Sequence, residues 1–222
     1  MGHRCEDGGF VMEWNGLIID TAVVGSVGTN CYIVHRKESD RCVVIDPGDN
    51  GDGIGRYIKD HGLILEDILL THGHFDHVLG VSGLIGSVGG RICAYEGEKE
   101  LLGDAGLNVS EMTGRPASIR ADVLLHDGQV YESAGMSFRV IYTPGHTRGS
   151  CCYYLEKEKA LFCGDTLFFE SVGRSDLPTG NGRQLVQSLK EKVLTLPEDV
   201  KAFTGHGPAT DIGYEKINNP FV

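Results

Sequence analysis

The sequence predicts an α/β fold, and two patterns in it support that prediction. Short apolar runs rich in valine and isoleucine, such as Leu17–Val24 and Cys42–Ile45, are typical of buried strands. Between them lie segments in which apolar residues recur at helical spacing, such as Asn181–Leu194. Because strands and helices alternate without a linker rich in proline or serine, we expect a single α/β domain over residues 1–222. We expect its first segment, 1–14, to be extended or flexible.

In the first half of the chain, the predicted strands end at Gly, Asp or Asn residues, and predicted helices lie between some of them. Strands are predicted over Leu17–Val24, Asn30–His35, Cys42–Ile45, Asp67–Leu70 and Arg91–Tyr95. Helices are predicted over Ile54–His61, which Gly62 ends, over the apolar, Gly-rich run Val78–Val88, and over Gly97–Gly103. The stretch 103–120 has no clear periodicity and is expected to be a surface insertion.

The second half repeats this alternation with more strands. Strands are predicted over Val123–Leu125, Gln129–Tyr131, Ser137–Tyr142, Ser150–Leu155, Ala160–Cys163 and Lys201–Thr204. The helix Asn181–Leu194 precedes the last of these strands. Each half ends in a loop that carries histidine, so the chemistry of the protein is expected at strand ends.

Composition excludes several classes of function. The chain has 32 glycines and a formal net charge of −11, from 31 acidic and 20 basic residues. Clustered Lys and Arg are what a phosphate backbone requires, so nucleic acid is not an expected partner. The sequence contains no run of about 20 apolar residues, so we expect no membrane-spanning helix. The excess of glycine indicates many positions where the backbone turns sharply or is closely approached.

The seven cysteines indicate a reducing compartment. Most of them lie in apolar, strand-like segments, and no Cys-x-x-Cys pair is present. Free cysteine in such a context behaves as a small buried hydrophobe. The first residues contain no apolar signal segment, so we expect a cytoplasmic protein. The adjacent Cys151 and Cys152 share a strand, where we expect one thiol to face the core.

The strongest chemical signal is the heptapeptide Thr-His-Gly-His-Phe-Asp-His that follows the strand Asp67–Leu70. Imidazole and carboxylate are the ligands of zinc, iron and manganese sites. His72 and His74 alternate like residues that leave a strand, so both can face one ion. Asp76 and His77 follow the turn and can face a second ion.

Three further strand ends have the same character. His146 lies in Thr-Pro-Gly-His-Thr, Asp165 lies in Cys-Gly-Asp-Thr, and His206 lies in Gly-His-Gly-Pro. Glycine stands beside each of these residues and lets the strand end bend toward a common point. The sequence therefore predicts one metal site assembled from several strand ends.

These motifs, with Asp46-Pro-Gly, occur in the order typical of the metallo-β-lactamase superfamily. The chain resembles that superfamily from about Leu17 to Pro220, and within it is most similar to the glyoxalase II-like (hydroxyacylglutathione hydrolase-like) enzymes. The resemblance implies a four-layer αβ/βα sandwich with metals at one edge. Only 16 residues follow His206, so the chain is similar to short members without the C-terminal helical domain.

The resemblance also implies a role for each motif residue. His72, His74 and His146 would bind the first metal, and Asp76, His77 and His206 the second. Asp165 would bridge the two metals, and Asp46 would brace the ligand loops. The cofactors would be two divalent ions, with zinc as first choice, although iron or manganese suit the same ligands.

Two metals that share a carboxylate also share a water, whose pKa zinc lowers to about 7. The expected reaction is attack of this bridging hydroxide, oriented by Asp76, on a thioester such as S-D-lactoylglutathione or another hydroxyacyl-thiol. A bridging Asp165 matches the glyoxalase II-like branch rather than true β-lactamases. Arg174 stands at the family's basic substrate position, while Asp176 replaces its aromatic residue.

Three alternatives use the same residues. A mononuclear iron persulfide dioxygenase would need only His72, His146 and Asp165. A lactonase would use the complete ligand set, and a non-catalytic metal-binding module would leave Arg174 without a role. The sequence favours a small-molecule substrate and does not fix the oligomeric state.

Overall fold

Two β-sheets pack face to face, and the direction of their strands decides which loops meet. The structure is a computed structural model that describes residues 3–4 and 10–222. The first sheet runs in chain order through β1 (His3–Arg4), β2 (Phe10–Trp14), β3 (Leu17–Val24), β4 (Thr29–Arg36), β5 (Arg41–Ile45), β6 (Ile64–Leu70), β7 (Arg91–Tyr95) and β8 (Val123–Leu125). The second sheet has the order β14 (Thr210–Asp211), β13 (Lys201–Thr204), β12 (Ala160–Gly164), β11 (Cys151–Leu155), β10 (Met136–Tyr142) and β9 (Val130–Ser133).

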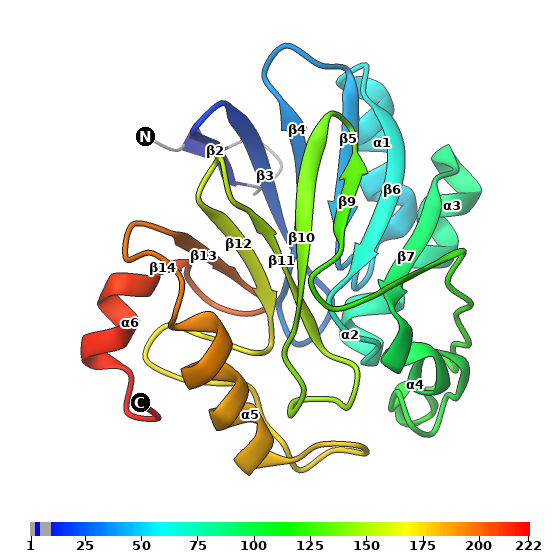
Figure 1. Cartoon of the computed structure of the whole chain (residues 1–222). Helices are drawn as coiled ribbons and strands as arrows, with labels where there is room; N and C mark the ends of the chain where they lie inside the picture. Colours follow the sequence, from blue (N-terminus) through cyan, green and yellow to red (C-terminus); the bar gives the residue numbers. More distant parts are fainter. Residues whose placement is uncertain (1–2, 5–9) are drawn as a thin grey trace.

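The helices lie on the two outer faces of this pair of sheets. The helices of the first half are α1 (Gly51–Asp60), α2 (Phe75–Val78), α3 (Val81–Val88) and α4 (Lys99–Gly103), which continues a 3-10 turn over Glu96–Glu98. Those of the second half are α5 (Gly182–Ser188), which runs into a π-helical turn over Leu189–Val193, and α6 (Ile212–Asn218). In Figure 1, α1 and α3 lie on one side of the sheets, and α5 and α6 on the other.

Three apolar clusters hold the layers together and establish the predicted four-layer sandwich. The central cluster lies between the sheets and includes Tyr153 and Phe162. A second cluster packs α1 and α3 on the first sheet, with Ile58 and Leu84 fully buried. The third packs the π-helical turn that follows α5 and the start of α6 on the second sheet, around Leu189. The chain therefore buries a core on both faces of each sheet.

Strand direction places the ligand-bearing loops at one edge. In the first sheet, β5 to β8 are parallel, so their C-terminal ends share an edge. In the second sheet, β10 and β12 are both antiparallel to β11, and β13 is parallel to β12. Hence β10, β12 and β13 also end at a common edge. The backbone of Cys151 donates a hydrogen bond to the carbonyl of Thr71 at 2.9 Å, which joins the two edges.

Several predicted elements have different bounds in the structure. The helix expected over Val78–Val88 begins only at Val81, because the amide of Gly80 donates to the carbonyl of Pro47 at 2.9 Å instead of to a carbonyl of the preceding turn. The helix expected over 181–194 changes to π geometry at Leu189. Within the segment 1–14, β2 pairs with β3, while residues 1–2 and 5–9 lie outside the described residues.

The stretch 103–120 forms a hydrogen-bonded loop rather than a regular element. It contains a 3-10 turn over Ser110–Thr113 and a fully buried side chain, Asn108. The amide nitrogen of Phe75 donates to the carbonyl of Asn108 at 2.9 Å. The insertion therefore supports the start of α2, which carries two of the predicted ligands. Among the described helices, none is long and apolar enough to cross a bilayer.

The six cysteines that the structure describes are free and buried. Cys151 belongs to the cluster between the sheets, and Cys152 to the cluster beneath α5. Burial raises the pKa of the Cys152 thiol to about 11 and that of Cys151 well above its ordinary value. Since thiolate is the reactive form, both thiols serve as packing residues.

An ion pair between the buried carboxylate of Asp67 and the exposed guanidinium of Arg91 lies where the first sheet meets the second. A bulge in β6 shifts its pairing with β5 between Leu65 and Asp67, which turns Asp67 toward the second sheet. The buried carboxylate of Asp67 accepts from the guanidinium of Arg91 at 2.8 and 3.1 Å and from the hydroxyl of Ser133 at 2.5 Å. The hydroxyl of Tyr131 donates to it at 3.1 Å. The pair therefore links β6 and β7 to β9.

Replacing Arg91 by alanine should leave the Asp67 carboxylate buried without a cation. Because 59% of the Arg91 side chain is exposed, solvent screens the pair, and we expect the free energy of unfolding to fall by about 1–2 kcal/mol. In a domain of this size, that loss lowers Tm by roughly 2–8 °C. Arg148→Ala is the matched control, since Arg148 pairs with Glu100 in solvent. Equal decreases in Tm for the two variants, measured by calorimetry, would contradict this role of Arg91.

Candidate dinuclear metal site

The seven predicted ligands come together at the shared edge of the two sheets. The strands β6, β10, β12 and β13 end there, and the loop after each carries at least one of them. The ligands are His72, His74, Asp76 and His77 after β6, His146 after β10, Asp165 after β12 and His206 after β13. Four of the five imidazoles are at most 2% exposed, and only His206 is reached by much solvent. The site is thus a nearly dry cluster of metal-binding groups.

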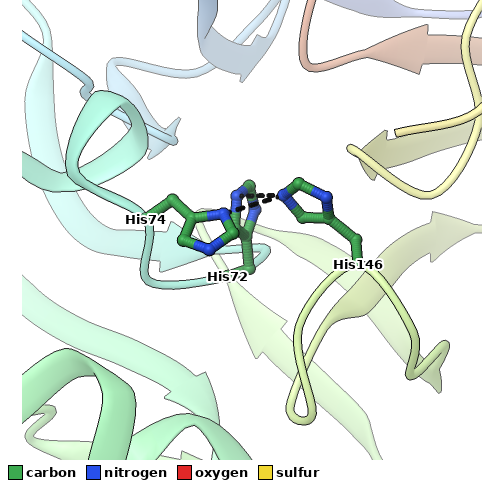
Figure 2. Close-up of side chains that lie close together, drawn as sticks. All are labelled: His72, His74 and His146. Atoms are coloured by element: carbon green, nitrogen blue, oxygen red, sulfur yellow. Dashed lines mark hydrogen bonds between the residues drawn. The ribbon is translucent and has the colours of Figure 1, made fainter. Parts of the chain in front are cut away.

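Three imidazole nitrogens converge on a single point. The Nε2 atom of His146 lies 2.9 Å from Nδ1 of His74 and 3.1 Å from Nε2 of His72. Figure 2 shows the three rings with these nitrogens pointing toward one another. Ligands at 2.0–2.1 Å from a tetrahedral ion stand roughly 3.3 Å apart, so small movements would admit a metal.

A second set lies beside the first. The Oδ2 atom of Asp76 is 3.1 Å from Nε2 of His206 and 3.5 Å from Nε2 of His77. The Nε2 atom of His77 is buried and has no hydrogen-bond partner among the described residues. A buried polar atom without a partner is costly, and a cation between these side chains would satisfy it.

Asp165 connects the two sets. Its Oδ2 atom is 3.4 Å from Nε2 of His146 and 3.6 Å from Nε2 of His206. Its Oδ1 atom lies 3.3 Å from Nε2 of His77 and has no hydrogen bond within the described part of the chain. Both the donor types and these unpartnered atoms fit a dinuclear metal site.

The outward-facing nitrogen of four rings is held by an oxygen. The Nδ1 atoms lie near the Thr71 hydroxyl for His72, the Asp46 carboxylate for His77, the Arg174 carbonyl for His146 and the Gly28 carbonyl for His206. A proton on Nδ1 leaves the lone pair on Nε2, which is the nitrogen that faces the cluster. Such outer bonds fix the ring orientation and tautomer of metal-binding histidines.

Asp46 braces the ligand loop from behind. Its carboxylate accepts from the Thr71 amide at 2.8 Å, from the Thr71 hydroxyl at 2.6 Å and from Nδ1 of His77 at 2.9 Å. It also lies near His72, but these bonds occupy both of its oxygens. The backbone of Asp46 has φ +51°, a conformation that Asp tolerates better than most residues.

The two ligand sets differ in the protonation state of histidine that their surroundings favour. Burial lowers the pKa of His72 well below its ordinary value, brings that of His74 to about 3 and also lowers that of His146. Burial opposes charge on His77 as well, but the carboxylates around it outweigh burial and raise its pKa well above the ordinary value. The first set is therefore neutral imidazole, the form that binds metals.

Glycine is required where the ligand loops touch. A Cβ atom on Gly205 would lie 2.1 Å from Oδ1 of Asp165 and 2.9 Å from Cε1 of His77. At Gly145, φ is +138°, and a Cβ atom would lie 2.1 Å from the amide nitrogen of Leu185. Both positions exclude a side chain for reasons of space, and Gly145 also for its backbone conformation.

Arg174 takes part in the site through its backbone. Its carbonyl accepts from Nδ1 of His146 at 2.6 Å. Its guanidinium, mostly exposed, donates to both oxygens of Asp176 at 2.7 and 2.8 Å. A substrate carboxylate that reaches Arg174 would therefore exchange with Asp176.

Sequence reasoning missed several residues that support the ligands. The Thr29 hydroxyl donates to Oδ2 of Asp76 at 2.9 Å, and the Asn30 amide donates to two carbonyls of the loop that carries His206. Glu98 is 1% exposed and accepts from the amide of Gly73, while burial raises its pKa to about 7. None of them lies in a recognisable motif, because their partners are distant in sequence.

The fold and the two ligand sets together define a metal-binding α/β sandwich of the hydrolase type. The chain belongs to the metallo-β-lactamase superfamily, whose family model matches residues 24–206. A probable metallo-hydrolase of Bacillus subtilis, YqgX, is 38% identical over 90% of this chain and 94% of its own length. A Haemophilus influenzae protein named hydroxyacylglutathione hydrolase GloC is 31% identical over 92% of this chain and 97% of its own.

Solved structures agree with this assignment. The crystal structure of the BLEG-1 B3 metallo-β-lactamase has a TM-score of 0.86 and 37% identity, covering 91% of this chain and 98% of its own. TTHA1623 in a di-iron-bound form has a TM-score of 0.81 and 34% identity, covering 91% of this chain and 99% of its own. The dinuclear arrangement is thus found in a similar protein, with iron as the metal.

Asp46→Asn should weaken metal binding without disturbing the backbone, because Asn also tolerates positive φ. One oxygen of the carboxylate becomes an NH₂ group, which accepts no hydrogen bond, so the bonds from Thr71 and His77 cannot all be kept. We expect a 10–100-fold loss of metal affinity, as for other outer partners of metal-binding histidines. Titration of the metal-free protein with Zn²⁺ measures it, and an unchanged affinity would show that Asp46 does not control His77.

Proposed function

We propose that this protein is a hydrolase that uses two divalent metal ions to cleave a thioester, such as S-D-lactoylglutathione or another hydroxyacyl-thiol. Zinc is the proposed metal, with iron or manganese as alternatives that the same ligands accept. The ligands would be His72, His74 and His146 for one ion and Asp76, His77 and His206 for the other, with Asp165 shared.

The position of Asp165 carries this proposal. Its carboxylate stands within 3.6 Å of ring nitrogens from both sets, so it can serve two ions at once. A mononuclear iron site of His72, His146 and Asp165 would also use this carboxylate, but it would leave the complete second set behind it without a role. The arrangement therefore supports dinuclear hydrolysis over a mononuclear iron dioxygenase.

When bound, the two ions would lower the pKa of a water molecule to about 7 and polarise the substrate carbonyl. The protein's part is to hold the reacting groups in place. Asp76 receives a hydrogen bond from Thr29 and faces His206, so its carboxylate is fixed where it can orient the attacking water. The buried rings around it keep bulk water from most of the site.

A thioester suits this set of side chains. Both carboxylates that reach the centre, Asp76 and Asp165, are paired with imidazoles, and no separate proton donor is evident among the described ligand loops. A thiol with a pKa near 8.5 can leave as thiolate, whereas an amine must be protonated. The name of the relative GloC supports the same substrate class.

A panel of four substrates distinguishes the reactions that the proposed site could catalyse. With two equivalents of Zn²⁺, the protein should release thiol from S-D-lactoylglutathione at least about 100-fold faster than His74→Ala. A lactone, glutathione persulfide with oxygen uptake, and nitrocefin complete the panel. Nitrocefin is included because BLEG-1, a structural neighbour, is described as a β-lactamase. Thiol release no faster than in His74→Ala would refute the thioester proposal.

Arg174→Ala should raise KM for an anionic thioester about 5–30-fold and leave kcat nearly unchanged. The physical reason is the loss of a bidentate partner for the substrate carboxylate. Arg41→Ala is the matched control, since Arg41 begins β5 at the opposite edge of the sheet and also pairs with a carboxylate, that of Glu66. An equal effect on a thioester that lacks carboxylates would contradict the role of Arg174.

A further inference from the structure

A buried glutamate joins the two loops that carry the three-histidine set. Glu98 ends the 3-10 turn before α4 and is 1% exposed. Its Oε1 atom accepts from the amide of Gly73 at 2.9 Å, and its Oε2 atom accepts from the hydroxyl of Thr147 at 3.1 Å. The amide of Gly149 also donates to this carboxylate. Each oxygen is therefore bonded to a different ligand loop.

These donors are the immediate neighbours of ligands. Gly73 lies between His72 and His74, and Thr147 follows His146. The three rings meet only if the two loops keep their present separation, since their nitrogens stand 2.9–3.1 Å apart. A shared carboxylate that spans the loops would fix this separation.

The loops are packed tightly on the segment that carries Glu98. A Cβ atom on Gly149 would lie 2.3 Å from Oε2 of Glu98, and one on Gly73 would lie 2.7 Å from Leu101. The segment that carries Glu98 is thus in close contact with both loops, and neither loop can move away without losing a bond to the buried carboxylate. Burying a carboxylate costs free energy unless donors satisfy it, and here every donor comes from a ligand loop.

We propose that Glu98 is a positioning residue that locks the loops of His72, His74 and His146 together and so sets the metal affinity of the three-histidine set. This inference rests on the dinuclear site of the proposed function. It is independent of the substrate that the site accepts. It predicts that Glu98 acts on one of the two metal positions and leaves the other nearly unchanged.

The test measures binding of Co²⁺ alone to the metal-free protein by its visible absorption. His206→Ala leaves the three-histidine set as the intact position, and His74→Ala leaves the other. In the first background, Glu98→Gln should weaken Co²⁺ binding 10–100-fold, because its NH₂ group cannot accept from a loop. In the second background, the same change should have little effect.

Glu215→Gln is the matched control. Glu215 is also a fully buried glutamate with neutral donors, but it lies on α6 and bonds Thr210 and Asn219. The Glu215→Gln substitution should lower Tm without changing the affinity of either metal position. Thr147→Val should reproduce part of the Glu98→Gln effect, and Thr147→Ser, which keeps the hydroxyl, should not. This pair tests the inference even if a change at Glu98 prevents folding.

The outcomes separate this inference from the proposed function. Equal weakening at both metal positions, or a loss of Tm with both affinities intact, would overturn the positioning role. A wild-type protein that binds no Co²⁺ would overturn both proposals. A selective loss at the three-histidine set in a protein that cleaves no thioester would support the role of Glu98 and refute the substrate alone.

Discussion

Five imidazole rings lie against one another at the edge of the sandwich, and the structure depends on how their outward-facing nitrogens are bonded. Each buried polar atom needs a partner, so a ring can point one nitrogen inward only if the other finds an oxygen. For four rings that oxygen comes from a different segment: Thr71, Asp46, Arg174 and the β3–β4 hairpin at Gly28. The orientation of the rings is thus fixed by loops from both halves of the chain.

Strand direction supplies the frame for this arrangement. Because β6, β10, β12 and β13 end at one edge, four ligand loops can meet without long excursions of the chain. The contact between them leaves no room for a side chain at Gly205, where a Cβ atom would collide with Asp165. Part of the high glycine content is therefore a consequence of the site.

The acidic composition also has an internal component. Asp46, Asp67, Glu98 and Glu215 are all buried, and each accepts hydrogen bonds from segments that are separate in the sequence. A buried carboxylate with several donors holds those donors at a fixed separation, which an apolar side chain cannot do. The sandwich uses such groups both between its sheets and behind its ligands, and Asp20, Glu158 and Asp165 are buried as well.

The sequence by itself determined the α/β class, most strands and the residues that meet in the site. The reason is local: each ligand stands beside glycine at the end of an apolar run, and these patterns are legible without the fold. Only the tertiary structure decided what holds the ligands, because Asn30 and Glu98 act on partners far along the chain. It likewise decided that α3 starts after Gly80, since the amide of Gly80 bonds the distant carbonyl of Pro47, and that the guanidinium of Arg174 pairs with Asp176.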